Sequence, residues 1–108
     1  MIVGILKEPE IDNRVALLPE NVKTLIDLRT SVIIEKGAGD RSFYSDNEYK
    51  EVGAHIVERS KLISDADLLV SINALSSDEY KKLNIHQAVL TAYGPLFNKD
   101  LLNQFVSD

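Results

Sequence analysis

Residues 4–19, GILKEPEIDNRVALLP, decide the fold because their character changes twice within a short distance. They begin inside an apolar segment, residues 2–6, that has the composition of a buried β-strand. A polar loop follows, and the sequence becomes apolar again just before Pro19, which suits the first turn of a helix because it has no N–H to leave unpaired. Loops at the carboxyl end of such a strand are where open α/β sheets place ligand-facing groups.

Strand-like and helix-like segments alternate through the rest of the chain. Ser45 with Glu48 and Ser76 with Glu79 have the spacing of capping boxes, which predicts a helix start at each serine. Further strands are predicted at residues 32–34, 54–57, 66–72 and 88–93, with short helices near Ser60 and after Asn98. This alternation predicts an α/β fold, a three-layer flavodoxin-like doubly wound parallel sheet of about five strands in the order 2-1-3-4-5.

Composition restricts the classes of function. The chain has 108 residues, enough for one domain spanning residues 1–108, and its 44% apolar and 27% charged residues are ordinary for a globular protein. A net charge of −5 without a basic run argues against nucleic acid as a partner. The absence of cysteine excludes disulfides and thiolate chemistry. No apolar run approaches membrane-spanning length, so the sequence predicts a soluble chain.

Four residues near predicted strand ends are candidates for a cleft. Lys7, Asn73 and Tyr93 lie at or just beyond the ends of strands, and Arg14 lies in the first loop. An arginine can hold a carboxylate or phosphate with two parallel hydrogen bonds. The alternative is an ion pair between Arg14 and an acid of its own loop, and composition favours that alternative about two to one. Each of the other three is individually more typical of a turn or cap.

Other motifs carry less chemistry. Gly37-Ala-Gly39-Asp40 lacks the third glycine of a dinucleotide fingerprint and is not followed at once by a helix, so a plain turn is favoured. His55 and His86 have no neighbouring acid or histidine at ligand spacing, which favours structural or exposed roles over a metal site. The residues alone therefore predict an α/β domain with one loop of interest and no complete active site, no catalytic residue and no metal site.

Three blocks of the sequence resemble the N-terminal domain shared by alanine dehydrogenases and nicotinamide-nucleotide transhydrogenases. GILKEPEIDNRVALLPENV resembles the opening signature of that family, in which a strand and a glutamate precede a polar loop, Arg-Val-Ala and a proline. VIIEKGAGDRSFYSDNEYKEVGAHIV resembles the next block, and ADLLVSINAL resembles the strand that follows it. The resemblance covers essentially the whole chain. The opening loop is one residue shorter than the usual pattern, and Leu6 stands where a proline is usual.

The resemblance also implies a branch of the family. In alanine dehydrogenases the substrate-binding arginine aligns with Arg14, the substrate-binding lysine with Asn73 and the catalytic histidine with Gly94, so two of the three groups are replaced here. The transhydrogenase alpha subunit is more similar. Its Val-Asn-Ala resembles residues 72–74, and its Trp-Pro-Ala-Gln-Asn resembles residues 94–98.

By this resemblance, the chain is expected to be the N-terminal subdomain of the NAD(H)-binding alpha subunit of a proton-translocating NAD(P) transhydrogenase, which transfers hydride between NADH and NADP⁺. A Rossmann subdomain after residue 108 would hold NAD(H), so the isolated chain is expected to be inactive and to bind no cofactor. Implied partners are a second copy (a homodimer), that Rossmann subdomain, and the NADP(H)-binding and membrane components. The implied location is cytoplasmic, peripheral to the inner membrane through partner subunits.

Two alternatives remain at this stage. The chain could be the substrate-binding lobe of an alanine or saccharopine-type dehydrogenase, in which Arg14 would hold a substrate carboxylate. It could also be a non-catalytic dimerisation domain.

Overall fold

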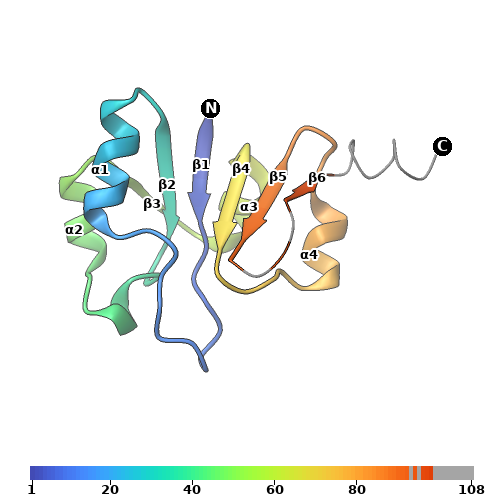
Figure 1. The fold of residues 1–108 in the computed structure, drawn as a ribbon, viewed down its shortest axis with the longest axis horizontal. Helices are drawn as coiled ribbons and strands as arrows, with labels where there is room; N and C mark the ends of the chain where they lie inside the picture. The colour runs from blue at the N-terminus through green and yellow to red at the C-terminus, as the bar shows by residue number, and fades with distance from the viewer. Residues whose placement is uncertain (93, 95, 99–108) are drawn as a thin grey trace.

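Six strands form a single sheet, and the first five are parallel (Figure 1). A computed structural model describes residues 1–92, 94 and 96–98. The parallel strands are β1 (Ile2–Ile5), β2 (Ser31–Glu35), β3 (His55–Val57), β4 (Leu68–Ser71) and β5 (Ala88–Thr91), and the short β6 (Phe97–Asn98) is antiparallel to β5. The helices are α1 (Pro19–Asp27), α2 (Asp46–Glu51), α3 (Arg59–Asp65) and α4 (Ser77–Lys82), with a 3₁₀ turn η1 (Asp40–Ser42).

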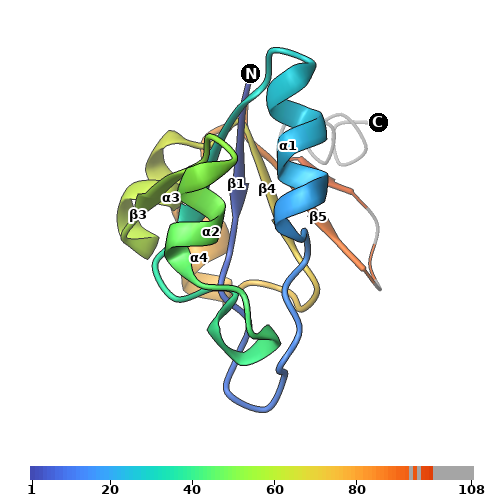
Figure 2. The same cartoon turned by 90° about the vertical axis from the view of Figure 1, so that its left-hand side faces the viewer.

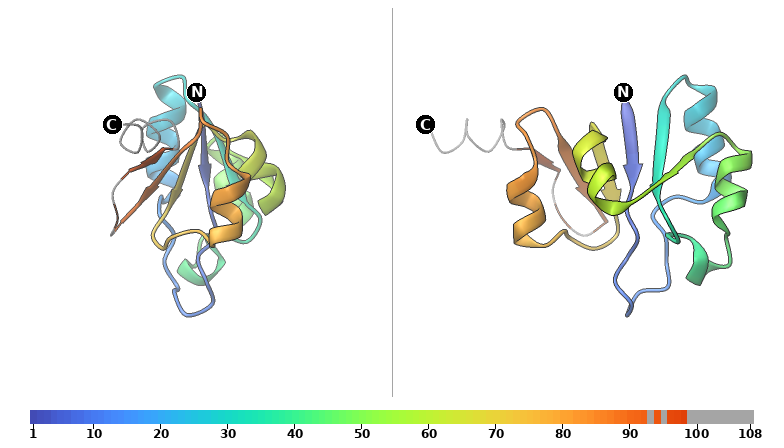
Figure 3. Two further views of the ribbon diagram at one scale, coloured as in Figure 1. Left: turned by 90° about the vertical axis from the view of Figure 1, so that its right-hand side faces the viewer. Right: turned by 180° about the vertical axis from the view of Figure 1, so that it is seen from behind.

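The predicted α/β class and the doubly wound parallel sheet are confirmed, but the predicted strand order 2-1-3-4-5 is wrong. The order is β3-β2-β1-β4-β5-β6. Because α1 and α2 pack into the same core, the two right-handed crossovers that contain them lead in one direction, from β1 through β2 to β3. The strand order was predicted to reverse after β2, but it reverses after β3. The connection through α3 then crosses the other face of the sheet and places β4 beside β1. Figure 3 shows α1 and α3 on opposite sides of the sheet.

Gly4 is the residue that lets α3 cross so closely. A Cβ atom on Gly4 would lie 2.7 Å from Leu62 Cδ2 and 2.8 Å from Ala66 Cβ, closer than real Cβ contacts. A glycine inside a buried strand often marks such a close approach of another element. The close packing of α3 on β1, which precedes the placement of β4 beside β1, therefore depends on the absence of a side chain at Gly4.

Most helix starts agree with the sequence. Pro19 occupies the first turn of α1, and both predicted capping boxes form, with Ser45 accepting from Glu48 N and Ser76 accepting from Glu79 N. The helix predicted near Ser60 instead begins at Arg59, with Glu58 as its cap residue. Asn98 is part of β6. The last predicted helix, after Asn98, lies outside the described residues.

Two apolar cores flank the sheet. One joins α1 and α2 to β1 and β2, with Ile5, Ile34 and Tyr49 fully buried. The other joins α3 to β4 and β5, with Leu62 and Leu69 fully buried. Within the described part of the chain, no helix combines the length and the apolar character needed to cross a bilayer.

Candidate functional site

An open pocket of about 260 Å³ lies at the carboxyl ends of β1, β2 and β4. This location is significant because the order of the strands reverses between β1 and β4: the chain first adds β2 and β3 on one side of β1, and then adds β4 and β5 on the other. Open α/β sheets bind ligands at such a switch point. The loop after β1 and the turn η1 lie together at this edge (Figure 2), joined by hydrogen bonds from Arg41 to Pro9 O and from Ser42 to Asn13 O. The lining residues include Lys7, Glu8, Glu10, Glu35, Arg41, Arg59, Ser71 and Asn73.

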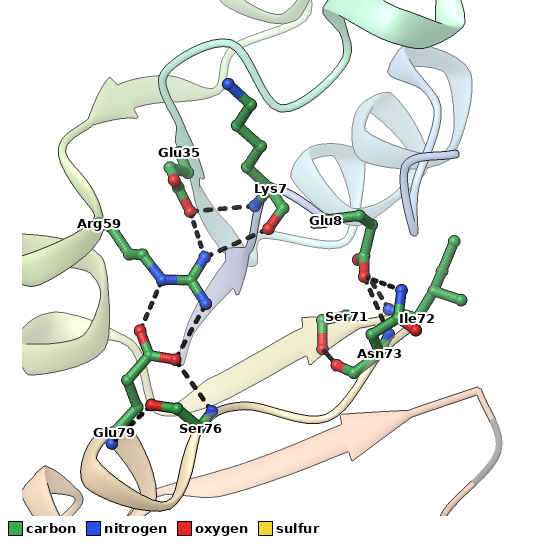
Figure 4. A network of polar contacts seen from close by, with 9 residues as sticks. All are labelled: Lys7, Glu8, Glu35, Arg59, Ser71, Ile72, Asn73, Ser76 and Glu79. Carbon is green, nitrogen blue, oxygen red and sulfur yellow. Dashed lines mark hydrogen bonds and ion pairs between the residues drawn. The ribbon is translucent and has the colours of Figure 1, made fainter. Parts of the chain in front are cut away.

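Glu8 joins the end of β1 to the end of β4. Glu8 follows β1, a central strand that lies between β2 and β4, and the residue is buried, with 5% of its surface exposed. The carboxylate accepts hydrogen bonds from Ile72 N at 2.8 Å and from Asn73 N and Nδ2 at 2.9 Å each (Figure 4). Two successive backbone N–H groups thus hold this carboxylate just beyond the last residue of β4. A buried carboxylate is tolerated only when its oxygens are satisfied in this way.

Asn73 connects this contact to Arg14. Its Nδ2 also donates to Asp12 Oδ2 at 2.9 Å, and Arg14 binds Asp12 through Nε and Nη2 at 2.9 Å each. These hydrogen bonds, first from the Arg14 side chain and backbone and then from Asn73, hold the pKa of Asp12 well below its usual range. Arg14 is therefore ion-paired within its own loop, and a neutral amide lies between two carboxylates.

Arg59 organises the other side of the pocket. It donates to Glu79 through Nε at 2.6 Å and Nη2 at 3.1 Å, and through Nη1 to Glu35 Oε1 at 2.7 Å and to Lys7 O at 3.2 Å (Figure 4). Hydrogen bonding to Arg59 lowers the pKa of Glu79 to about 2, against an opposing effect of burial. The contact with Glu79 in turn raises the pKa of the guanidinium. One cation thus ties the ends of β1 and β2 to α4.

Lys7 is fixed through its backbone rather than its side chain. Its N–H donates to Glu35 Oε1 at 3.0 Å, and its carbonyl accepts from Arg59. The ammonium group points away from Arg59 (Figure 4), toward the turn that contains Gly37. Among the described residues, no carboxylate forms an ion pair with it.

The structure brings together three of the four predicted cleft residues. Lys7 and Asn73 line the pocket, and Arg14 reaches Asn73 through Asp12. Tyr93 lies outside the described residues. Whether any of them contacts a ligand stays a prediction.

Sequence reasoning missed the roles of Glu8, Glu35 and Arg59. Glu35 is the last residue of β2 and Glu8 comes three residues after the end of β1, and a carboxylate so close to the end of a buried strand is a usable signal. Arg59 follows a helix cap residue and gives no comparable signal, because its partners come from three separate elements.

These residues do not fit a nicotinamide dinucleotide by themselves. The connection from β1 to α1, residues 6–18, contains no glycine that would let a pyrophosphate approach the backbone. In the glycine-containing turn, Gly37 N donates to Asp46 Oδ1, and Gly39 packs against Tyr49. Glu35 stands at the end of β2, the position from which an acidic residue of dinucleotide-binding folds contacts a ribose hydroxyl, but here Arg59 donates a hydrogen bond to its carboxylate. The described residues also contain no cluster suited to a metal ion.

Comparisons with known proteins agree on one family. The model of the family described as "Alanine dehydrogenase/PNT, N-terminal domain" matches residues 4–108. The alanine dehydrogenase of Staphylococcus haemolyticus is 34% identical over 109 residues, which cover 100% of this chain and 29% of that protein. Alanine dehydrogenase 2 of Staphylococcus aureus is likewise 34% identical, with the same coverage. The chain thus spans less than a third of these curated relatives.

Two solved structures have the same fold. The crystal structure of a transhydrogenase from Sinorhizobium meliloti superposes with a TM-score of 0.74 at 32% identity, covering 84% of this chain and 27% of that one. An L-alanine dehydrogenase superposes with a TM-score of 0.76 at 29% identity, covering 84% of this chain and 26% of that one.

Proposed function

The chain belongs to the alanine dehydrogenase/PNT N-terminal domain family, and from this membership and the pocket we propose that it is the N-terminal lobe of a transhydrogenase-type subunit. In this proposal a second, dinucleotide-binding unit holds NAD(H), and hydride passes from it to NADP⁺ held on another component. The lobe supplies one wall of the cleft. Closure of the two units excludes water from the reacting nicotinamide.

One observation carries the choice of branch. The Asn73 amide lies between the Glu8 and Asp12 carboxylates, and the Arg14 guanidinium binds Asp12. An α-keto acid or amino acid substrate would bring a further carboxylate to a position that already has two. Like charges at such short range disfavour binding, and a neutral amide does not compensate as a lysine ammonium would. This part of the pocket is therefore better suited to contact an uncharged group than to bind the carboxylate of a substrate.

The second candidate is the substrate-binding lobe of an alanine dehydrogenase. It is favoured by the names of the curated relatives, which are alanine dehydrogenases at 34% identity over the full length of this chain. Under this reading Arg14 would exchange Asp12 for a substrate carboxylate. The resemblance that places a lysine at Asn73 and a histidine at Gly94 weighs against it.

The proposal gives partners a definite place. The cofactor-holding unit would close over the pocket edge of the sheet, and NADP(H)-binding and membrane components would join through that unit. Peripheral attachment to the membrane would then come from partners and not from this lobe.

A domain graft tests the branch. This chain replaces the matching 109 residues of the S. haemolyticus alanine dehydrogenase, and the matched control is the same graft with Asn73→Lys and Gly94→His. We expect both grafts to bind NADH, measured by its fluorescence, because the rest of the recipient enzyme is unchanged. Only the doubly substituted graft should oxidise alanine, since only it regains a cation and a proton-transfer group at the strand ends.

In the doubly substituted graft, the histidine at position 94 needs space that Thr91 partly occupies. A Cβ atom there would lie 2.8 Å from Thr91 Oγ1, so the threonine hydroxyl must rotate to admit histidine. Alanine oxidation by the graft with Asn73 and Gly94 unchanged would contradict the transhydrogenase assignment and establish the second candidate. The intact protein, assayed for hydride transfer from NADH to an NADP⁺ analogue and for pyruvate amination, gives an independent answer.

A further inference from the structure

The side-chain amide of Asn73 has only one orientation that satisfies its neighbours. Its Nδ2 donates to Glu8 Oε1 and to Asp12 Oδ2, at 2.9 Å each, and Figure 4 shows the contact with Glu8. An asparagine amide carries two N–H groups on its nitrogen and only lone pairs on its oxygen. Because an ionised carboxylate accepts hydrogen bonds and donates none, only the nitrogen can lie between Glu8 and Asp12. The chemistry of these two neighbours therefore fixes which end of the amide faces them.

This orientation leaves Oδ1 as the available polar atom of Asn73. The backbone N–H donates to Glu8, the backbone carbonyl accepts from the Ser71 hydroxyl, and both N–H groups of Nδ2 are used. Within the described part of the chain, no donor reaches Oδ1. Asn73 is half-buried and lines the pocket. Its carbonyl oxygen therefore offers an acceptor to a ligand, whose N–H can take the place of water there.

An anionic group is disfavoured beside Asn73. Arg14 forms an ion pair with Asp12, but among the described residues no cation forms one with Glu8. The Glu8 oxygens are held by N–H groups of residues 72 and 73 instead. A ligand carboxylate or phosphate would therefore meet a carboxylate that has no cationic partner, and like charges at short range oppose binding.

A cationic group is disfavoured at the other side of the pocket. Lys7 and Arg41 line it there, and the Lys7 ammonium forms no ion pair with a carboxylate of the described residues. An uncharged carboxamide suits both sides, because its N–H can donate to Asn73 Oδ1 and its carbonyl can accept from a cation. The pocket, about 260 Å³ in volume, has room for one aromatic ring that carries such a group.

We propose that Asn73 determines the class of ligand that this pocket accepts, with Oδ1 receiving a hydrogen bond from the N–H of an uncharged carboxamide. Glu8 is the positioning residue, because it holds both the Asn73 amide and the backbone N–H groups just beyond β4. The inference rests on the proposed function for the role of the pocket, since it takes these strand ends as the ligand-facing wall of a cleft. It adds the chemical group that the wall recognises.

Three pyridines of nearly equal size test the proposal on the 108-residue chain. Nicotinamide has an uncharged N–H donor, nicotinate has a carboxylate at the same place, and the corresponding acetylpyridine has a carbonyl but no N–H. Nuclear magnetic resonance follows the side-chain amide of Asn73 during each titration. We expect nicotinamide to bind with a dissociation constant on the order of 10 mM, because so small a molecule makes few contacts. The acetylpyridine should bind about fivefold more weakly, since it lacks one hydrogen bond, and nicotinate should bind more weakly still.

A substitution at Asn73 separates recognition from general effects on the chain. Asn73→Ala should abolish the preference for nicotinamide over the acetylpyridine, because it removes the acceptor. The backbone N–H signal of Ala74, which also lines the pocket, reports binding in this variant. Asn47→Ala is the matched control and should retain the preference, since Asn47 donates only to Glu51 on α2 and does not line the pocket.

A substitution at Glu8 tests the positioning role. In Glu8→Gln the new NH₂ group can donate to Asn73 Oδ1, so the asparagine amide can turn around and its acceptor is no longer presented. We therefore expect the preference for nicotinamide to fall in this variant as well. A merely structural role for Glu8 would lower the melting temperature and leave the preference unchanged, which would remove Glu8 from the proposal.

The binding series has definite contrary outcomes. Equal binding of the three pyridines, tighter binding of nicotinate, or no shift with nicotinamide up to about 100 mM would overturn the proposal. So would a preference that survives Asn73→Ala. The proposed function fails on a different result, namely the absence of hydride transfer from NADH in the intact protein. In that case the order of the three pyridines still decides which group the pocket accepts.

Discussion

At the residue scale, Arg59 and Glu79 show how one cation determines the geometry of the pocket wall. Arg59 makes two hydrogen bonds to Glu79 and one each to Glu35 and the Lys7 carbonyl. Removing one partner of such a network leaves the others incompletely paired. The network therefore has a pH dependence that can be measured.

We expect Glu79→Gln to weaken the response of stability to acid. Because the pKa of Glu79 falls from 4.5 to about 2 on folding, its ionised form stabilises the folded chain above the unfolded value, and this contribution is lost as the pH falls from 4.5 toward 2. The variant should be less stable near neutral pH and should lose less stability in acid. Urea titrations at about pH 6 and about pH 3 measure both quantities. An unchanged acid response would show that Glu79 is not held by Arg59.

At the element scale, the crossing of α3 over β1 determines where β4 enters the sheet. We expect Gly4→Ala to cost about 1–3 kcal/mol of unfolding free energy, because the new methyl group would overlap Leu62 and Ala66. Adding Ala66→Gly should recover part of the loss, since it removes one of the two overlapping groups. Denaturant unfolding of the single and double variants measures this coupling. A fully stable Gly4→Ala chain would mean that α3 does not pack on β1.

The same crossing explains what the sequence could and could not predict. Ser45 and Ser76 cap their helices through residues three positions away, so local spacing was enough to predict both helix starts. The strand order depends on which face of the sheet each helix covers. The spacing of apolar residues is the same for the predicted and the observed order, so it could not distinguish them. Gly4 held the only local signal of the crossing. Within the site, Arg14 and Asn73 could be chosen from their positions, but Arg59 could not, because its partners are 20, 24 and 52 residues away.

At the scale of the whole molecule, the described residues form one six-stranded sheet, and the proposed function gives this sheet one wall of a binding cleft. Its pocket lies at the point where the strand order reverses, and two of the acids that line it, Glu8 and Glu35, are hydrogen-bonded within the lobe. Its relatives are more than three times as long, since it covers 29% of their length. We infer that the dinucleotide is held by a unit outside these 108 residues.

Calorimetric titration of NADH into the folded 108-residue chain tests this inference most directly. No heat of binding should be measurable, because the connection from β1 to α1 offers no glycine-lined cradle for a pyrophosphate. Binding with a dissociation constant on the order of 1 μM, or about −8 kcal/mol, would contradict it and place the cofactor site within this lobe.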